Sequence, residues 1–153
     1  MEIQYIPYRN EFREDLSEMV ISLYSEDPSG EKMNDKKIEN TICYIQSHPD
    51  NGRIEMIIHD QLVIGYAIIV YFWSNEYGGS VLLLDELFMR EEFRGKGIGT
   101  GFLKNLISAE SGKCKAIFLE VIPSNTKAME FYRKAGFMIH VNKFHRYLLG
   151  SQD

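Results

Sequence analysis

Residues 91–102 read Glu-Glu-Phe-Arg-Gly-Lys-Gly-Ile-Gly-Thr-Gly-Phe, with glycine at every second position from Gly95 to Gly101. Such a run can bring several backbone N–H groups to one point, because no Cβ atoms stand in the way. At the start of a helix these N–H groups are unpaired, and the positive end of the helix dipole favours an anion. The segment therefore predicts a phosphate or diphosphate site, and a simple glycine turn is the alternative.

Two common nucleotide-binding motifs do not fit this run. A Walker loop requires Ser or Thr after its Gly-Lys pair, whereas Gly97 follows Lys96 here. The dinucleotide fingerprint Gly-x-Gly-x-x-Gly also fails, because Thr100 or Phe102 occupies its last position. What remains is Arg-x-x-Gly-x-Gly, in which Arg94 and Lys96 add positive charge that attracts an anion.

A pair of carboxylates interrupts the apolar strand predicted over Val81–Arg90, directly before this loop. In a regular strand the neighbours Asp85 and Glu86 would point to opposite faces. Charged groups in such a strand are costly unless they are solvated or paired, so the pair is either a structural ion-pair site or functional. One carboxylate could accept a proton from a reacting amine while the other binds an ammonium group. We favour Glu86 as the base, the reverse assignment stays open, and Glu120 is a third candidate.

Apolar spacing and turn residues predict the elements that would position these groups. The order is one strand, two helices, three antiparallel strands, then helix, strand, helix and two short strands. The strand–helix–strand unit from Val81 to Ile122 should be a right-handed parallel crossover. Asn10 and Asp35 are predicted to cap the first two helices, and Asp60 with Gln61 to form a hairpin turn. The predicted strands are Glu2–Ile6, Arg53–His59, Leu62–Trp73, Val81–Arg90, Ala116–Ile122, Phe137–Val141 and Phe144–Leu149. The last two helices run from the glycine loop to about Ala109 and from Asn125 to about Ala135, where Gly136 fits the helix end.

Length and composition restrict the possible partners. The chain has 153 residues, which suits one domain over residues 1–153. Its formal net charge is −5 and its basic residues do not cluster, which argues against nucleic acid. No apolar run is long enough to span a membrane and no signal peptide is recognisable, so we expect a cytoplasmic protein. Cys43 and Cys114 are expected to be free thiols, and His140 and His145 lack the further ligands of a metal site.

Two segments resemble the GCN5-related N-acetyltransferase family. Residues 84–106, LDELFMREEFRGKGIGTGFLKNL, look like its strand, Arg-x-x-Gly-x-Gly loop and helix. Residues 122–137, IPSNTKAMEFYRKAGF, look like its second motif, Asn-x-x-Ala-x-x-Phe-Tyr-x-x-x-Gly-Phe. The resemblance implies an α/β fold with a mixed sheet. Its N-terminal strands would be mostly antiparallel, and its parallel strand–helix–strand core would splay to hold acetyl-CoA.

The same resemblance implies roles for individual residues. Tyr132 would be the general acid that protonates the leaving thiolate, and Asn125 would lie near the thioester end of the cofactor. The backbone of Leu87, Phe88 and Met89 would pair with the pantetheine arm like an extra strand. No metal is implied. The N–H groups that would bind the diphosphate belong to Gly95, Lys96, Gly97, Ile98, Gly99 and Thr100.

Residues 71–89 also look like the corresponding part of diamine and polyamine acetyltransferases within this family. With acidic residues in the first long loop, among them Glu26 and Asp27, this favours a small cationic amine as the acceptor. An aminoglycoside, an amino acid or a protein or peptide amine stays open, as does a non-catalytic acetyl-CoA-binding module. Trp73 and Tyr77 could line the acceptor pocket or a dimer contact. Because dimers are common in the family, we expect a homodimer.

Overall fold

The computed structural model describes residues 2–27 and 29–150 of the chain. The chain divides into two compact units, Met1–Glu120 and Val121–Asp153. The single domain expected over residues 1–153 stays a prediction. Within the described residues, no helix is both long enough and apolar enough to cross a membrane.

The first unit is built around one five-stranded sheet. In spatial order its strands are β1 (Ile3–Pro7), β2 (Gly52–His59), β3 (Leu62–Ser74), β4 (Gly79–Met89) and β5 (Ala116–Phe118). The pairs from β1 to β4 are antiparallel, whereas β4 and β5 are parallel. Helix α3 (Ile98–Glu110) connects the two parallel strands. The predicted α/β class, with a mixed sheet and a parallel strand–helix–strand core, is therefore confirmed.

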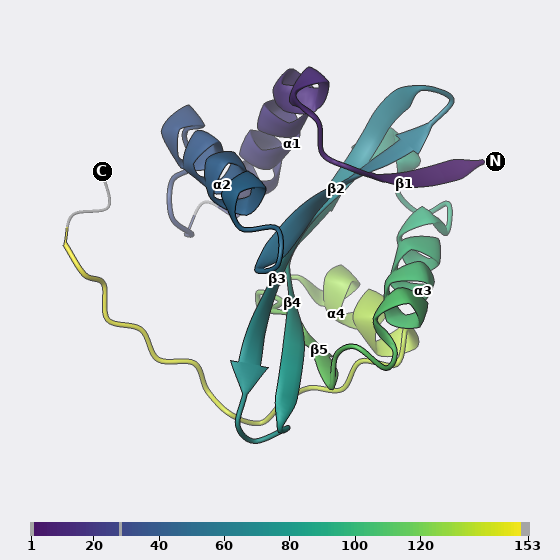
Figure 1. Ribbon diagram of the computed structural model, residues 1–153. Helices are drawn as coiled ribbons and strands as arrows, with labels where there is room; N and C mark the ends of the chain where they lie inside the picture. Colours follow the sequence, from purple (N-terminus) through teal and green to yellow (C-terminus); the bar gives the residue numbers. More distant parts are fainter. Residues whose placement is uncertain (1, 28, 151–153) are drawn as a thin grey trace. The chain divides into compact units, whose positions relative to one another are not determined.

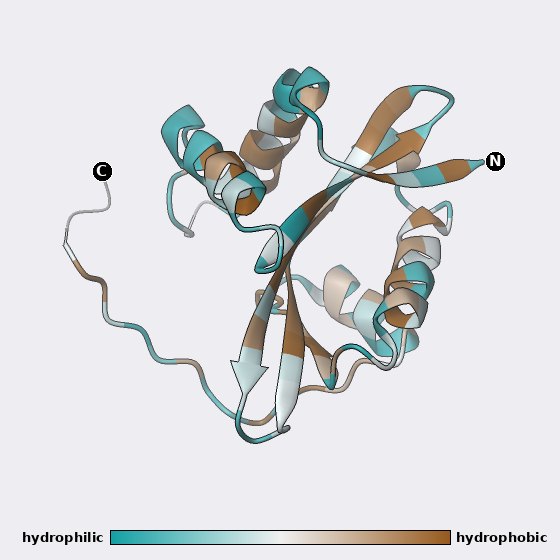
Figure 2. Cartoon of the chain, in the orientation of Figure 1, coloured by the Kyte–Doolittle hydropathy of each residue, from teal (hydrophilic) through white to brown (hydrophobic). Residues whose placement is uncertain are grey.

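Helices cover both faces of this sheet. Helices α1 (Arg13–Ser25) and α2 (Asp35–Ser47) lie on one face and α3 lies on the other, as Figure 1 shows. Figure 2 shows hydrophobic residues along the middle of the strands and hydrophilic residues on the outer turns of α1 and α2. Burying this apolar surface supplies the main driving force for folding. The core under α1 and α2 contains Leu16, Met19, Val20, Ile38, Ile42, Ile54, Met56, Ile58, Tyr66, Ile68 and Phe88.

The residues predicted to cap the first two helices do not cap them. Asn10 starts a short 3-10 turn, η1 (Asn10–Phe12), and Phe12 directly precedes α1, so Asn10 does not cap that helix. In α2 the side chain of Asn34 accepts a 2.9 Å hydrogen bond from the Lys37 N–H. The cap is therefore Asn34 and not Asp35, which is the first helical residue. Asn and Asp are both good caps, so composition alone does not choose between adjacent ones.

The predicted turn between β2 and β3 is confirmed. Asp60 and Gln61 both have positive φ, 48° and 64°, as a two-residue hairpin turn requires when its twist matches that of the strands. The β3–β4 hairpin extends beyond β2, whose pairing ends at Gly52 and Val70. Its turn closes at Gly78, which has φ 63°.

Helix α3 is held on the sheet by apolar and ionic contacts. Its buried residues include Phe102, whose ring meets that of Tyr5 edge-on at 5.5 Å. At its C-terminal end, the buried Glu110 accepts a 3.0 Å hydrogen bond from Tyr71 and lies 3.1 Å from Arg53 Nη1. These contacts fix the helix, and hence the loop that leads into it.

The second unit contains one helix, α4 (Thr126–Lys134), within its described residues. The helix begins where it was predicted to begin, and Asn125 caps it: its Oδ1 accepts a 3.1 Å hydrogen bond from the Ala128 N–H. Gly136 follows the helix with φ 97°, which confirms its predicted position at the helix end.

The two strands predicted over Phe137–Val141 and Phe144–Leu149 are wrong. The described residues 137–150 take part in no strand pairing. An alternating apolar run becomes a strand only where a neighbouring edge accepts its hydrogen bonds. The large apolar side chains of this segment are exposed: Met138, Ile139, Val141, Phe144, Tyr147, Leu148 and Leu149.

Candidate functional site

A β-bulge in β4 decides how the two carboxylates are presented. Ile68 pairs with Glu86 and Ile69 pairs with Leu84, so Asp85 is an extra residue on β4. A bulge interrupts the alternation of side chains, and the opposite faces expected of a regular strand no longer follow. Asp85 is exposed, whereas Glu86 is only 8% exposed.

Two tyrosine hydroxyls hold the carboxylate of Glu86. Tyr24 on α1 donates to Oε1 at 2.6 Å, and Tyr66 on β3 donates to Oε2 at 2.8 Å. Burial raises the pKa of Glu86, the two hydrogen bonds lower it, and the charge of Asp85 raises it, with a net upward shift. Burial and the adjacent carboxylate raise the pKa of both tyrosines, so both hydroxyls remain donors.

Asp85 lies just beyond the point where β4 and β5 separate. Their pairing ends at Leu83 and Phe118, although β4 continues, so β5 stops short of the predicted Ile122. Glu120 follows Phe118 at the same spacing at which Asp85 follows Leu83. Although exposed, Asp85 is partly surrounded by protein. The pKa of Asp85 is raised, mainly by this partial burial and also by repulsion from the charge of Glu120. A raised pKa brings a carboxylate closer to the range useful for a general base.

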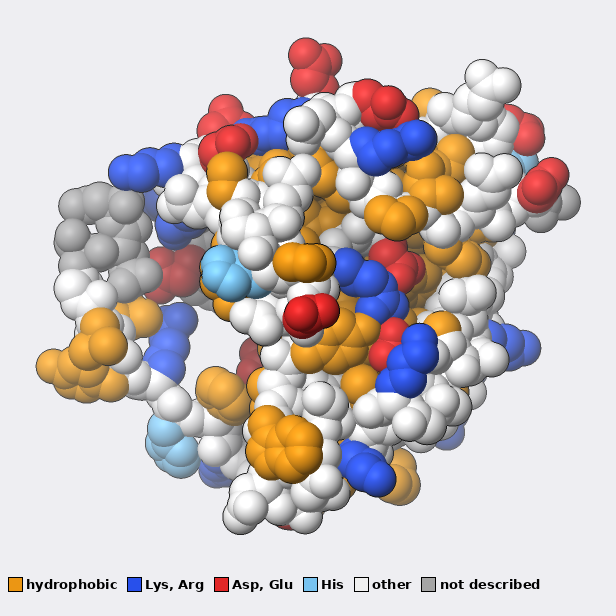
Figure 3. All heavy atoms as spheres, in the orientation of Figure 1, with side chains coloured by type: hydrophobic (Ala, Val, Ile, Leu, Met, Phe, Trp, Pro, Cys, Tyr) orange, Lys and Arg blue, Asp and Glu red, His pale blue; other side chains and the backbone are white. Residues whose placement is uncertain are grey.

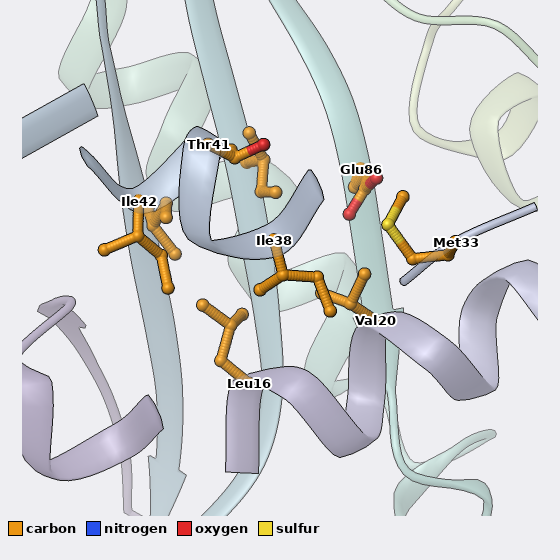
Figure 4. Close-up of a pocket in the computed structure, with 9 residues that line it drawn as sticks. Leu16, Val20, Met33, Ile38, Thr41, Ile42 and Glu86 are labelled. Carbon is orange, nitrogen blue, oxygen red and sulfur yellow. The ribbon is translucent and has the colours of Figure 1, made fainter. Parts of the chain in front are cut away.

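A small cavity lies between α1, α2 and the sheet, and Glu86 is part of its wall (Figure 4). Its volume is about 20 Å³, which is room for about one water molecule and not for an amine acceptor. An acceptor would therefore reach the carboxylates from the exposed side of Asp85. The cavity is lined by Leu16, Val20, Met33, Ile38, Thr41, Ile42, Ile54, Ile68 and Glu86.

The glycine-rich loop runs from the short turn η2 (Glu91–Phe93) into α3. Gly97 is the N-cap with φ 79° and Gly95 has φ 72°, conformations that strongly favour glycine. Chain neighbours aside, no described atom lies within 4 Å of the place that a Cβ would take at either residue.

Backbone donors of this loop are left for a ligand. The first N–H used inside α3 is that of Gly101, which bonds the Gly97 carbonyl at 3.0 Å. The preceding N–H groups at a helix start have no partner within the helix. This arrangement fits a diphosphate held by the predicted donors from Gly95 to Thr100.

β4 offers a backbone edge next to this loop. The Arg90 N–H bonds the Ile64 carbonyl at 2.8 Å, and alternate residues of a strand direct their N–H groups the same way. Phe88 therefore faces β3, while Leu87 and Met89 direct their backbone groups to the other edge, where the β5 ladder has ended. Of the three residues predicted to pair with pantetheine, two have outward-facing groups.

The basic side chains of the loop have partners within the protein. Arg94 Nη2 lies 2.7 Å from Glu26 Oε1, and Arg94 Nε donates to the Met89 carbonyl at 2.8 Å. The ammonium of Lys96 lies 5.3 Å from the ring centroid of Phe93. Both side chains add positive charge near the loop, but Arg94 is not a free ligand.

In the second unit, Asn125 and Tyr132 belong to the two ends of α4. Tyr132 is half-buried, with ring centroids of Phe131 and Phe137 at 4.9 and 5.7 Å. Burial raises the pKa of Tyr132 to about 12, so its hydroxyl is protonated at neutral pH. The roles predicted for Asn125 and Tyr132 stay predictions.

The sequence did not reveal Tyr24 as part of the site. Helical spacing predicts a helix around it, but its partner Glu86 is 62 positions further along the chain. Tyr66 is one of several aromatic residues of β3, and no local signal in the sequence distinguishes its hydroxyl from theirs. Contacts of this kind depend on which helix packs over which strand.

Aromatic side chains gather near the end of the β3–β4 hairpin. The ring of Phe118 lies 6.1 Å from that of Phe72 and 5.8 Å from that of Tyr77, while Trp73 is 71% exposed. A role of Trp73 and Tyr77 in an acceptor pocket stays a prediction.

Within the described part of the chain, no group of three or more His, Cys, Asp or Glu side chains is arranged to bind a metal ion. On the face drawn in Figure 3, acidic and basic side chains are interspersed.

A sequence profile described as the Acetyltransferase (GNAT) family matches residues 10–137. The match includes the carboxylate pair, the glycine-rich loop and α4. The chain belongs to the GNAT family. The family predicted from two motifs is thus confirmed over most of the GNAT chain's length.

Two curated relatives of this GNAT chain carry names that specify amines. The spermine/spermidine N(1)-acetyltransferase of Bacillus subtilis (strain 168) is 33% identical over 82 residues, covering 51% of this chain and 54% of that protein. The thialysine N-epsilon-acetyltransferase of Bos taurus is 31% identical over 75 residues, covering 48% and 44% respectively. The chain thus spans about half the length of the curated relatives that it matches.

Solved structures share the fold over nearly the whole chain. A possible acetyltransferase from Clostridium difficile 630 has a TM-score of 0.80 at 18% identity, covering 99% of this chain and 100% of that one. Arabidopsis thaliana Naa50, in complex with the bisubstrate analogue CoA-Ac-MVNAL, has a TM-score of 0.66 at 18% identity, covering 92% and 85%. At these identities the likeness establishes the fold.

Proposed function

We propose that this GNAT protein transfers an acetyl group from acetyl-CoA to a primary amine of a small cationic acceptor. One observation carries the proposal: the exposed carboxylate of Asp85 lies on the same strand as the outward backbone edge of Leu87 and Met89. That edge leads directly into the glycine loop with its free N–H groups. A short segment of chain thus provides both a surface for the donor and a proton acceptor for the amine.

The donor would be held mainly by backbone groups. The N–H groups from Gly95 to Thr100 suit the diphosphate, and the outward groups of Leu87 suit an amide of pantetheine, as in strand addition. The Met89 carbonyl already accepts a hydrogen bond from Arg94 Nε. Acetyl-CoA, when bound, supplies an activated acetyl thioester. The Met89 N–H is a suitable donor for negative charge that develops on the acetyl oxygen.

We assign proton acceptance to Asp85. An alkyl ammonium has a pKa of about 10.4, so the acceptor must lose a proton before it can attack. Within the described residues no hydrogen bond or ion pair occupies the side-chain carboxylate of Asp85, and its pKa is raised. Both oxygens of Glu86 already accept tyrosine hydroxyls, which suits a fixed anion that attracts an ammonium. This supports the reverse of the assignment favoured from the sequence.

The charges near Asp85 support a cationic acceptor. Asp85 and Glu86 are adjacent, and Glu120 is close enough to raise the pKa of Asp85. Relatives named for spermine/spermidine and thialysine support small amines of this kind. We therefore propose a diamine-like or polyamine-like acceptor, with aminoglycosides, amino acids and peptide amines as alternatives.

Two residues of the second unit complete the proposal. Tyr132 would act as the general acid, because its protonated hydroxyl can stabilise and protonate the leaving thiolate. Asn125 uses its Oδ1 as the helix cap, which leaves its amide N–H groups for the thioester end of the cofactor. The family motif, not a contact between the units, supports both assignments.

We also propose that the protein is a cytoplasmic homodimer. Both cysteines are free, which suits a reducing compartment. The exposed apolar side chains of residues 138–149 support burial against a second copy. Sedimentation analysis at several concentrations tests the dimer, and a monomer at all of them would contradict it.

An amine panel tests the proposed activity. The purified chain is incubated with acetyl-CoA, a thiol-detecting reagent and one amine at a time: diamines, polyamines, lysine analogues, aminoglycosides and peptide N-termini. Release of free CoA that diamines or polyamines stimulate most strongly supports the proposal. Strong stimulation by another amine class would assign a different acceptor. Tight acetyl-CoA binding without stimulation by any amine would instead indicate a non-catalytic binding module.

A further inference from the structure

The side chain of Arg94 makes contacts within the protein that a residue serving only to bind phosphate would not need. Its Nε donates to the Met89 carbonyl at 2.8 Å, and its Nη2 donates to Glu26 at 2.7 Å. Its guanidinium carbon lies 5.2 Å from the ring centroid of Phe88. Its backbone N–H bonds the Glu91 carbonyl at 3.1 Å and so is not a loop donor either. Arg94 therefore joins the start of the donor loop to β4 and to the end of α1.

Glu26 lies in the turn that ends α1. Its N–H bonds the carbonyl of Leu23 at 3.2 Å, and the next N–H, of Asp27, bonds the carbonyl of Tyr24 at 3.3 Å. The same turn therefore carries both Glu26, which holds Arg94, and Tyr24, whose hydroxyl holds Glu86. Movement of Glu26 would move Tyr24 with it.

A second chain of contacts leads from Arg94 to the same carboxylate. The ring of Phe88, over which the guanidinium lies, stacks on the ring of Tyr66 at 6.0 Å. The hydroxyl of Tyr66 donates to the other oxygen of Glu86. Both donors to Glu86 are thus one step removed from a group that contacts Arg94.

We infer that Arg94 and Glu26 are positioning residues: their ion pair holds the end of α1 against the donor loop so that Tyr24 keeps the Glu86 carboxylate fixed beside Asp85. This inference rests on the proposed function. The pair is exposed, at 43% and 48% of the two side chains, and exposed pairs add little to stability. Its loss should therefore disturb the acceptor side of the site and leave the fold intact.

A double-mutant cycle tests the inference. The variants are Glu26→Gln, Arg94→Gln and the two combined, with Glu92→Gln as the control. Like Glu26→Gln, the Glu92→Gln substitution removes one negative charge near the loop. Within the described residues Glu92 forms no ion pair. Initial rates give kcat and the KM for the most active amine, and calorimetry gives the affinity for acetyl-CoA in the absence of amine.

Each single variant should raise the KM for the amine about two- to fivefold, the size expected when one exposed ion pair is lost. Affinity for acetyl-CoA should stay within about twofold of the wild type. The combined variant should be no worse than the worse single variant, because both remove the same interaction. The control should match the wild type in all three quantities.

Other results would overturn the inference. If Arg94→Gln weakens acetyl-CoA binding tenfold or more while Glu26→Gln leaves the amine KM unchanged, Arg94 is a phosphate ligand. Additive effects in the combined variant would also contradict a shared role. A wild type that acetylates no amine refutes the proposed function separately. In that case the NMR signals of the Tyr24 ring still test whether the Arg94–Glu26 ion pair positions Tyr24. These signals should shift in both single variants and not in the control. Unchanged signals in the single variants would refute this positioning role.

Discussion

The hydroxyl of Tyr24 lies 2.6 Å from Oε1 of Glu86 and joins α1 to β4 across 62 positions of sequence. Tyr66 satisfies the other carboxylate oxygen, yet the net pKa of Glu86 is raised because burial outweighs the two hydrogen bonds. An ionised carboxylate in this place reduces stability at neutral pH. A group that is retained in spite of such a cost is a candidate for function.

Replacing Glu86 with Gln should stabilise the fold at neutral pH. Because the folded-state pKa is raised, the folded chain binds this proton more tightly than the unfolded chain, whose Glu pKa is about 4.3. Wild-type stability therefore falls as the pH rises from below that value through the folded-state pKa. Gln carries no charge at any pH, and its carbonyl can still accept a tyrosine hydroxyl. Urea unfolding should show a gain for the variant near pH 7 that shrinks near pH 4.

Glu92→Gln serves as the control for this measurement, since Glu92 is exposed. Its stability difference from the wild type should not depend on pH in this way. A Glu86→Gln variant that is less stable than the wild type near pH 7 would mean that the ionised carboxylate contributes net stability. Acetyl transfer by the same variant should fall, which would separate the functional from the structural role.

Replacing Asp85 with Asn should lower kcat by about 100-fold or more near neutral pH, the usual contribution of a positioned general base. Without the base, attack depends on acceptor that is already deprotonated. The rate of the variant should therefore rise steadily as the pH approaches the amine pKa of about 10.4. The measurement is kcat as a function of pH, and a variant with wild-type rates near neutral pH would remove Asp85 from the mechanism.

The neighbouring Glu120 allows an independent check on Asp85. The charge of Glu120 raises the pKa of Asp85, so Glu120→Gln should lower that pKa. The acid limb of the pH–rate profile should then move to lower pH while the maximal rate is nearly kept. A limb that does not move would mean that a group other than Asp85 is titrating.

The parts of the fold with local signals were predicted well from the sequence. The Asp60 and Gln61 turn, the start of α4 at Asn125 and the glycine start of α3 each depend on residues close together in the chain. The bulge at Asp85 depends instead on the register of β3 against β4, which cannot be predicted from the residues of β4 alone. The contact of Tyr24 with Glu86 likewise depends on the packing of α1 over the sheet.

The two strands predicted from Phe137 onward were wrong because a local pattern does not determine pairing. Alternating apolar residues state a preference for extended structure, but they do not supply the neighbouring strand that makes a ladder. For Arg94, too, the sequence pattern does not show which partner the side chain contacts in the fold. Its place in the motif predicted attraction of a diphosphate, whereas its side chain is occupied by Glu26 and the Met89 carbonyl.

Replacing Gly97 with Val should weaken acetyl-CoA binding at least about tenfold while the fold persists. A β-branched residue is strained at φ 79°, at about 1–2 kcal/mol, and its side chain would enter the open space beside the loop N–H groups. The buried face of α3, which includes Phe102 and Leu106, is unchanged. Calorimetry measures the affinity, and circular dichroism confirms the fold.

Gly112 provides a matched control for Gly97. It has φ 84°, nothing lies near its missing Cβ, and it follows the opposite end of α3. Gly112→Val should therefore lose similar stability without losing affinity for acetyl-CoA. If the two variants bind acetyl-CoA equally well, the glycine-rich loop is a turn and not a diphosphate site.

Replacing Tyr132 with Phe should lower turnover at least about tenfold and leave acetyl-CoA affinity nearly unchanged, because only the hydroxyl is lost. The ring keeps its contacts with Phe131 and Phe137, so α4 should remain folded. Because the pKa of Tyr132 is raised to about 12, its loss should lower the rate evenly between about pH 6 and pH 9 and not move either limb of the profile. Tyr147→Phe, at an exposed tyrosine of the same unit, should behave like the wild type. A Tyr132→Phe variant with full turnover would leave the thiolate to be protonated by another group or by water.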